Sequence, residues 1–197
     1  VAFVECNSEQ LDFFTRSLEL GAGVRVLPVL IDDLLSDDDD IRQRLREMDL
    51  VVTTFFHLDE VREVLGGNAE VLGIALDPEM ETMVRLAQVP SDRPVALICL
   101  SRVFAQRVRK SLEQSGLAHL DTRIELSRDP EVLQKVLSGV GAAIVSPGRR
   151  RDVERLCPGD FPIIEFIYKP DAGSVNALQR KLIERYRNRG GDNVGIE

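Results

Sequence analysis

The segment Val51-Val52-Thr53-Thr54-Phe55-Phe56-His57 joins a β-branched run to two aromatic residues and a histidine. The residues that follow, Leu58-Asp59-Glu60-Val61, turn acidic and are typical of a helix start. This order predicts a buried strand that passes directly into a helix. Because ligands in α/β proteins bind at the carboxyl ends of such strands, we expect the segment to form one wall of a cleft. A shorter segment of similar pattern at 142–149 is expected to form the opposite wall of the cleft.

Short apolar strands alternate with amphipathic helices on both sides of this segment. The predicted strands are 1–5, 24–31, 51–57, 71–76, 95–100, 122–126, 142–145 and 163–168. The predicted helices are 8–20, 32–48, 58–65, 80–86, 101–115, 129–137, 152–156 and 171–187. Since short connections of this kind require right-handed crossovers, the strands are expected to be parallel.

The two halves of the chain repeat one another at an offset of 92 to 94 residues. The matching segments are 1–4 with 95–98, 53–54 with 145–146, and 77–79 with 169–171. A repeat of this kind predicts two similar lobes, each an α/β unit with a parallel sheet of about four strands flanked by helices. The expected ranges are 1–91 for the first lobe, 92–189 for the second and 190–197 for a flexible tail, with a turn-rich boundary at 90–94.

The composition of the chain disfavours nucleic-acid-binding and membrane-spanning classes of protein. The excess of 33 acidic over 25 basic residues gives a formal charge of -8, which disfavours direct binding to nucleic acid. Apolar runs fall short of the roughly 20 residues that a membrane-spanning helix needs. Three cysteines without a CxxC spacing suit a reducing compartment, and we expect a cytoplasmic protein.

Metal and catalytic sites are not expected from the sequence. His57 and His119 are the two histidines, so a metal centre would need mainly carboxylates. The run 37–40 of four aspartates could bind a cation, but a first helical turn already favours acidic residues. Cys6 and His57 could form a nucleophile and base pair, although a cysteine at an apolar strand is usually packing. No GxSxG, P-loop, GxGxxG or HExxH pattern occurs, so we expect no enzyme activity and no cofactor.

Polar and aromatic residues at the expected strand ends suit recognition of a small polar or anionic metabolite. The candidate ligand-binding residues are Glu5, Asn7, Thr54, Phe55, Phe56, His57, Asp77, Ser101, Arg102, Ser146, Arg149, Tyr168 and Ser174. His57 is either a ligand contact or a first-turn histidine bonded to local backbone. The segment 146–149 either binds an anion through backbone donors and Arg149 or forms a tight turn. The segment 171–174 is expected to cap a helix in the first place and to contact a ligand in the second.

Three segments resemble the effector-binding region of a GntR-type bacterial transcription regulator. They are Phe3-Val4-Glu5-Cys6-Asn7, Asp49-Leu50-Val51-Val52-Thr53-Thr54-Phe55-Phe56-His57-Leu58-Asp59-Glu60-Val61, and Gly73-Ile74-Ala75-Leu76-Asp77-Pro78. The resemblance is to the kind whose regulatory part is similar to a small two-lobed periplasmic-binding-protein fold. It implies a ligand in the cleft between the lobes, a homodimer, and a winged-helix DNA-binding domain upstream of Val1.

Two alternatives use the same cleft. One is an exported solute-binding protein of a transport system, whose gene would start with a signal sequence. The other is a two-lobed enzyme of the synthase or lyase type, in which His57, Arg102 or Arg149 would be essential for turnover.

Overall fold

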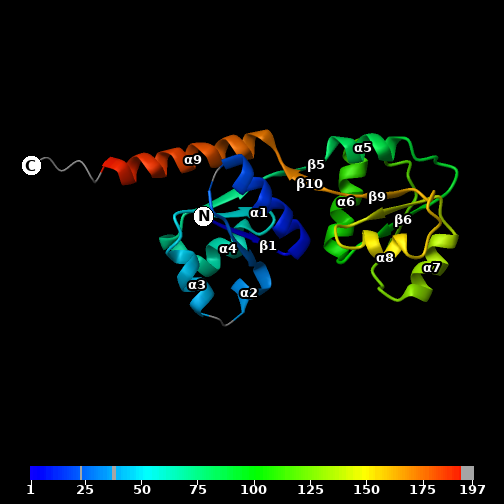
Figure 1. The fold of residues 1–197 in the computed structure, drawn as a ribbon, viewed down its shortest axis with the longest axis horizontal. Helices are drawn as coiled ribbons and strands as arrows, with labels where there is room; N and C mark the ends of the chain where they lie inside the picture. Colours follow the sequence, from blue (N-terminus) through cyan, green and yellow to red (C-terminus); the bar gives the residue numbers. More distant parts are fainter. Residues whose placement is uncertain (23, 37–38, 192–197) are drawn as a thin grey trace, which may run out of the picture. The chain divides into compact units, whose positions relative to one another are not determined.

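The computed structural model describes residues 1–22, 24–36 and 39–191, which divide into two compact units. Unit 1 is Val1–Asp77 together with the described residues from Lys169 onward, and unit 2 is Pro78–Tyr168. Each unit contains one four-stranded parallel sheet flanked by helices (Figure 1). The predicted α/β fold with two similar lobes is therefore confirmed.

The sheet of unit 1 has the order β2-β1-β3-β4. Its strands are β1 (Ala2–Glu5), β2 (Leu27–Leu30), β3 (Val51–Thr54) and β4 (Val71–Ile74), and all the pairs are parallel. Both central strands, β1 and β3, are buried along their whole length. A strand that is covered on both faces favours an unbroken apolar or β-branched run, which is the pattern that Val51–Thr54 shows.

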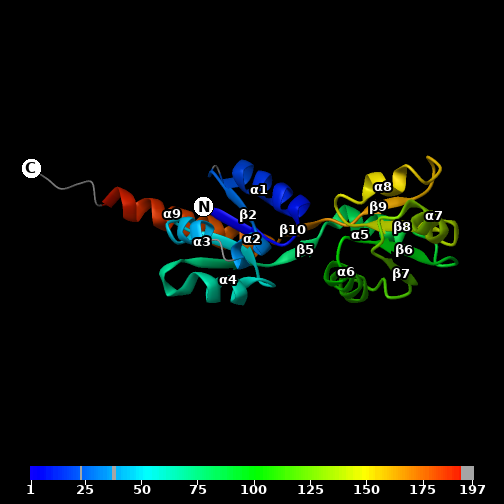
Figure 2. The same ribbon diagram turned by 90° about the horizontal axis from the view of Figure 1, so that it is seen from below.

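Helices cover both faces of this sheet. They are α1 (Ser8–Ala22), α2 (Ile31–Leu35), α3 (Asp39–Arg46), α4 (Leu58–Leu65), the 3-10 turn η1 (Gly66–Asn68) and α9 (Ala172–Gly191). One face packs Ala2, Val4 and Val51 against α2, α3 and α4. Phe3 points to the other face and meets Phe14 of α1 edge to face, with ring centroids 5.5 Å apart. Accordingly, α1 and α4 lie on opposite sides of the sheet (Figure 2).

Unit 2 repeats the same strand order, β7-β6-β8-β9. Its strands are β6 (Val95–Ile98), β7 (Thr122–Glu125), β8 (Ala142–Val145) and β9 (Ile163–Glu165), again all parallel. Its helices are α5 (Met80–Ala87), α6 (Arg102–Gln114), α7 (Pro130–Ser138) and α8 (Arg150–Glu154). The equal strand orders confirm the internal repeat.

The chain passes between the units twice. The crossing segments are β5 (Leu76–Pro78) and β10 (Tyr168–Pro170), which pair with each other. The sequence predicted a single crossing near residue 91, with α5 in the first lobe, whereas α5 and the turn at 90–94 lie within unit 2. Asp77 and Pro78 belong to β5, and α5 begins at Met80, where the predicted helix 80–86 also begins.

Three other predicted elements differ in extent. The helix expected at 32–48 is divided into α2 and α3, and Asp39 in α3 lies 3.7 Å from Arg42. Asp37, Asp38 and the tail residues 192–197 lie outside the described residues, whereas 190–191 still belong to α9. The strand expected at 163–168 is divided into β9 and the crossing strand β10. None of the helices within the described ranges is both long and apolar enough to cross a membrane.

Substitution of Gly73 by alanine is expected to lower the free energy of unfolding by about 1 kcal/mol. An added Cβ would lie 2.8 Å from Cδ1 of Phe55 and 2.9 Å from Cδ2 of Leu58, so both side chains must move. Gly67→Ala is the matched control, since nothing lies within 4 Å of its added Cβ. Urea unfolding of both variants tests the packing, and equal stabilities would contradict it.

Candidate functional site

The candidate site lies at the carboxyl end of the unit 1 sheet. Glu5 is the last residue of β1, Cys6 follows it, and His57 follows β3 as the residue before α4. Between β1 and β3 the strand order reverses, because the chain builds β2 on one side of β1 and β3 on the other. Such a switch point is where open parallel sheets bind ligands.

Glu5 places a carboxylate at this point with no exposure to solvent. Its Oε1 accepts hydrogen bonds from the backbone N–H of Cys6 at 3.0 Å and from the Cys6 thiol at 3.1 Å. Its Oε2 is buried and has no hydrogen-bond partner within the described part of the chain. Burial raises the pKa of Glu5, but the contacts with His57 and Cys6 outweigh that effect and hold the pKa below its usual value. The carboxylate is therefore charged and only partly satisfied.

His57 lies between two carboxylates. Its Nε2 is 3.5 Å from Oε1 of Glu5, which is an ion-pair distance rather than a well-formed hydrogen bond. Its Nδ1 is 3.0 Å from Oε2 of Glu60, one turn further along the chain. The contacts with Cys6 and Glu5, with a smaller one from Glu60, raise the pKa of His57 to about 10 against the opposing effect of burial. The ring is thus an imidazolium at neutral pH.

The three side chains bring different donor atoms together. A carboxylate oxygen of Glu5, the sulfur of Cys6 and a ring nitrogen of His57 all lie within 4.8 Å of one another. This set could hold a metal ion, or the pair of Cys6 and His57 could act as nucleophile and base. The sequence did not reveal the grouping, because Glu5 and Cys6 are 51 or more residues away from His57 and become neighbours through the pairing of β1 with β3.

Unit 2 has an arginine in the place of His57. Arg149 lies 92 residues after His57 and occupies the same position, between the third strand of its sheet and the next helix. The acidic partner is repeated as well, since Nε of Arg149 is 3.0 Å from Oδ2 of Asp152, again three residues further on. The spacings His57-x-x-Glu60 and Arg149-x-x-Asp152 are a signal that sequence reasoning missed.

Arg149 is a buried structural residue, not an open ligand contact. Its side chain has no exposure to solvent. Its guanidinium donates hydrogen bonds to the carbonyl oxygens of Cys99 at 3.2 Å, Leu126 at 3.3 Å and Ser127 at 2.5 Å. These donors tie the ends of β6 and β7 to the start of α8. The tight-turn interpretation of 146–149 also fits, because the N–H of Arg149 donates to the carbonyl of Ser146 at 3.0 Å.

Several other predicted ligand residues have local structural roles. Asn7 accepts from the N–H of Gln10 at 3.0 Å and caps α1, and Ser101 caps α6. The Tyr168 hydroxyl is 3.0 Å from that of Ser111, within unit 2. Burial raises the pKa of Tyr168.

Ser174 fastens α9 to the rest of unit 1. Its hydroxyl accepts from the N–H of Ala75 at 2.8 Å and lies 3.0 Å from Oδ2 of Asp171. Asp171 in turn accepts from the N–H of Ser174, which confirms the predicted cap at 171–174.

Four other candidates are exposed to solvent. Phe55 and Phe56, next to His57, are 60% and 57% exposed. Asp77 in β5 and Arg102 at the start of α6 are exposed as well.

Two buried hydroxyls at the sheet ends have no hydrogen-bond partner. They belong to Thr54 in unit 1 and Ser146 in unit 2, which occupy matching positions in the repeat. The predicted residues that the structure gathers at the unit 1 edge are therefore Glu5, Thr54, Phe55, Phe56 and His57.

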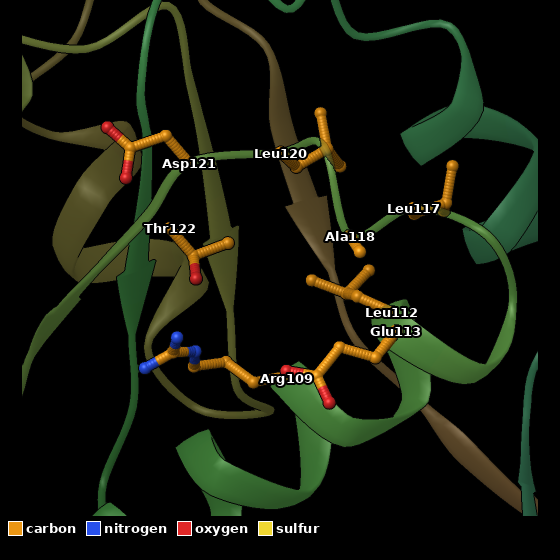
Figure 3. A pocket seen from close by; sticks show the side chains of 8 residues that line it. All are labelled: Arg109, Leu112, Glu113, Leu117, Ala118, Leu120, Asp121 and Thr122. Atoms are coloured by element: carbon orange, nitrogen blue, oxygen red, sulfur yellow. The ribbon is translucent and has the colours of Figure 1, made fainter.

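A cavity of about 180 Å³ lies elsewhere, in unit 2. Arg109 of α6 and Asp121 and Thr122 at the start of β7 line it (Figure 3). The start of β7 is the opposite end of the sheet from the strand carboxyl ends, where parallel sheets bind ligands. The chemistry of the donor groups favours the unit 1 edge over this cavity as the candidate site.

Replacing Arg149 with alanine is expected to lower the free energy of unfolding by about 3 kcal/mol, because one buried and two half-buried carbonyls lose their donors. Arg151→Ala is the control, since its side chain is exposed and its removal should change stability by less than about 0.5 kcal/mol. Chemical denaturation measures both. An Arg149→Ala protein as stable as Arg151→Ala would disprove the structural role.

The stabilising effect of His57 should depend on pH. Because folding raises its pKa from 6.5 to about 10, its contribution is complete below about pH 6.5 and is lost as the pH rises through about 10. In EDTA, the stability advantage of the wild type over His57→Gln should therefore shrink between about pH 7 and pH 10. Urea unfolding at several pH values measures it, and a constant advantage would argue against the imidazolium.

Comparison with known proteins identifies relatives of the chain. Residues 96–189 match the family model of the YmtS Rossmann-like domain, a range that covers the unit 2 sheet, β10 and most of α9 but not Glu5, Cys6 or His57. The chain is also similar to a protein of Clostridium tetanomorphum described as "Uncharacterized protein in mutS 5'region", with 37% identity over 95 residues. That match covers 48% of this chain and 95% of the relative. The chain therefore belongs to the same family as this clostridial protein, with residues 96–189 matching the YmtS Rossmann-like domain.

Proposed function

We propose that the chain is a small-molecule-binding sensory domain whose ligand binds at the carboxyl edge of the unit 1 sheet. The observation that carries the proposal is the buried, charged and incompletely bonded Glu5 beside His57 at the switch point. Buried polar groups without partners are uncommon in proteins and are concentrated at sites of function. The ligand would be a small polar metabolite.

The exposed aromatic pair supports binding at this edge. Phe55 and Phe56 follow β3 directly and offer apolar faces next to the polar cluster. Ligand sites combine such surfaces with a few charged groups that fix orientation. The N–H of Phe55 donates to the carbonyl of Ile74 at 3.0 Å, which ties this segment to the sheet.

The regulatory context of the proposal rests on the resemblance to GntR-type effector-binding regions. In that context the domain would act in the cytoplasm as part of a homodimer. Ligand binding would then change DNA affinity through another domain of a longer protein, provided that the ligand binds one conformation more tightly than another.

A second candidate function is thiol-dependent catalysis. The observation that favours it is the order Cys6, His57 and Glu60, in which one ring nitrogen of His57 faces Cys6 and Glu5 and the other is held by Glu60. This order matches that of a nucleophile, a base and a residue that orients the base. Iodoacetamide that modifies Cys6 much faster than Cys157 would favour it over sensing alone.

The proposal predicts a ligand whose binding depends on the unit 1 edge. A thermal-shift screen of amino acids, carboxylates, sugars and nucleotides, in EDTA, should find a compound that stabilises the wild type. At 100 times its Kd, the compound adds about 2.7 kcal/mol to the free energy of unfolding. His57→Gln and Phe56→Ala should each weaken its binding about tenfold, as measured by calorimetry.

Tyr186→Ala is the matched control, because Tyr186 is an exposed aromatic residue of α9 in the same unit. It should bind the compound as the wild type does. A ligand whose affinity is the same in the wild type and both site variants would place binding elsewhere and refute the proposal.

A further inference from the structure

We propose that Glu5, Cys6 and His57 form a three-ligand site for a divalent late transition-metal ion of the zinc class, with a fourth coordination position open. The inference deepens the proposed function and rests on the same site, since an ion with an open position would anchor a small ligand there. It assigns a metal to a protein whose sequence predicted none.

The donor set fits this class of ion. A thiolate, an imidazole and a carboxylate are the ligands that Zn²⁺ and its neighbours prefer, whereas Mg²⁺ and Ca²⁺ favour oxygen alone. Zinc bonds of about 2.0 to 2.3 Å in tetrahedral geometry place the donors about 3.5 Å apart. Glu5 Oε1 lies 3.5 Å from Nε2 of His57, which already fits, and 3.1 Å from Sγ of Cys6, which is somewhat shorter.

Glu60, which contacts the other ring nitrogen of His57, is the kind of partner that a metal-binding histidine has. Metal-binding histidines almost always direct their second ring nitrogen to a carboxylate or carbonyl, which fixes the ring. Nδ1 of His57 is 3.0 Å from Oε2 of Glu60, while Nε2 faces Glu5 and lacks a well-formed hydrogen bond. Nε2, the ring nitrogen that Glu60 does not contact, is therefore the one that faces the other two proposed ligands, Glu5 and Cys6.

Charge gives an independent reason for a cation at this point. The matching place in unit 2 holds the permanent charge of Arg149. In unit 1 the buried carboxylate of Glu5 faces a histidine, whose ring nitrogen can bind a metal ion. A bound ion would give Glu5 a doubly charged partner.

The site is open to solvent on one side. Cys6 is exposed, and the neighbouring Phe55 and Phe56 are more than half exposed. An ion can therefore enter without unfolding the unit.

Cobalt titration of the EDTA-treated, dialysed full chain tests the site. Co²⁺ is expected to bind in one equivalent and to give the near-ultraviolet charge-transfer absorption of a thiolate ligand, which Zn²⁺ then displaces. Cys6→Ser should lose this absorption, and His57→Gln and Glu60→Gln should lower the Co²⁺ affinity about tenfold or more. Circular dichroism checks that each variant is folded.

Cys157→Ser and His119→Gln are the matched controls, since they remove the same groups outside the cluster and should bind Co²⁺ as the wild type does. No thiolate absorption in the wild type, or absorption that survives in Cys6→Ser, would overturn the metal site. The cysteine at position 6 is exposed, so its replacement tests ligation without disturbing the core.

The metal site and the proposed function can fail separately. A compound that binds in EDTA through His57 and Phe56, together with a wild type that shows no Co²⁺ thiolate absorption, would uphold sensing and refute the metal. The thiolate absorption without any compound that binds, either in EDTA or with the metal ion bound, would uphold the metal and refute the sensing of a metabolite.

Discussion

In each sheet, a positively charged side chain lies at the carboxyl end, just before the helix that follows the third strand. Parallel strands end there in backbone carbonyls, and the strand order reverses at this point. In unit 2 the guanidinium of Arg149 bonds three carbonyls there, whereas in unit 1 His57 faces the carboxylate of Glu5. The acidic partner three residues further on, Glu60 or Asp152, fixes each cation in place.

The same position therefore supports different roles in the two units. A guanidinium keeps its charge at any physiological pH and presents five donors, so it suits a permanent structural role. An imidazolium can give up its proton and then offer a nitrogen lone pair. In unit 2 this position is occupied by the buried Arg149, while unit 1 has titratable and metal-ligating groups at the equivalent point.

Much of the fold could be predicted because strand runs such as Val51–Thr54 and the repeat between the halves depend on local pattern. The paired crossing strands could not, since β5 and β10 have three residues each and no periodicity to detect. For the site, the position of His57 at a strand end was predictable, but its partners Glu5 and Cys6 are brought to it by sheet pairing. The burial of Arg149, predicted as an anion contact or part of a tight turn, could not be predicted because it depends on carbonyls from two other segments, the ends of β6 and β7.

The double crossing makes unit 2 a continuous insertion within unit 1, which has consequences for biosynthesis. All residues of unit 2 are joined in one stretch, Pro78–Tyr168, so its sheet can be completed while the chain is still being made. Unit 1 requires α9, which is held by Ser174 and by the ion pairs of Lys181 and Arg185 with Glu70. The ribosome supplies that helix after all of unit 2, so β1 to β4 are translated before unit 2 but their own unit is completed after it.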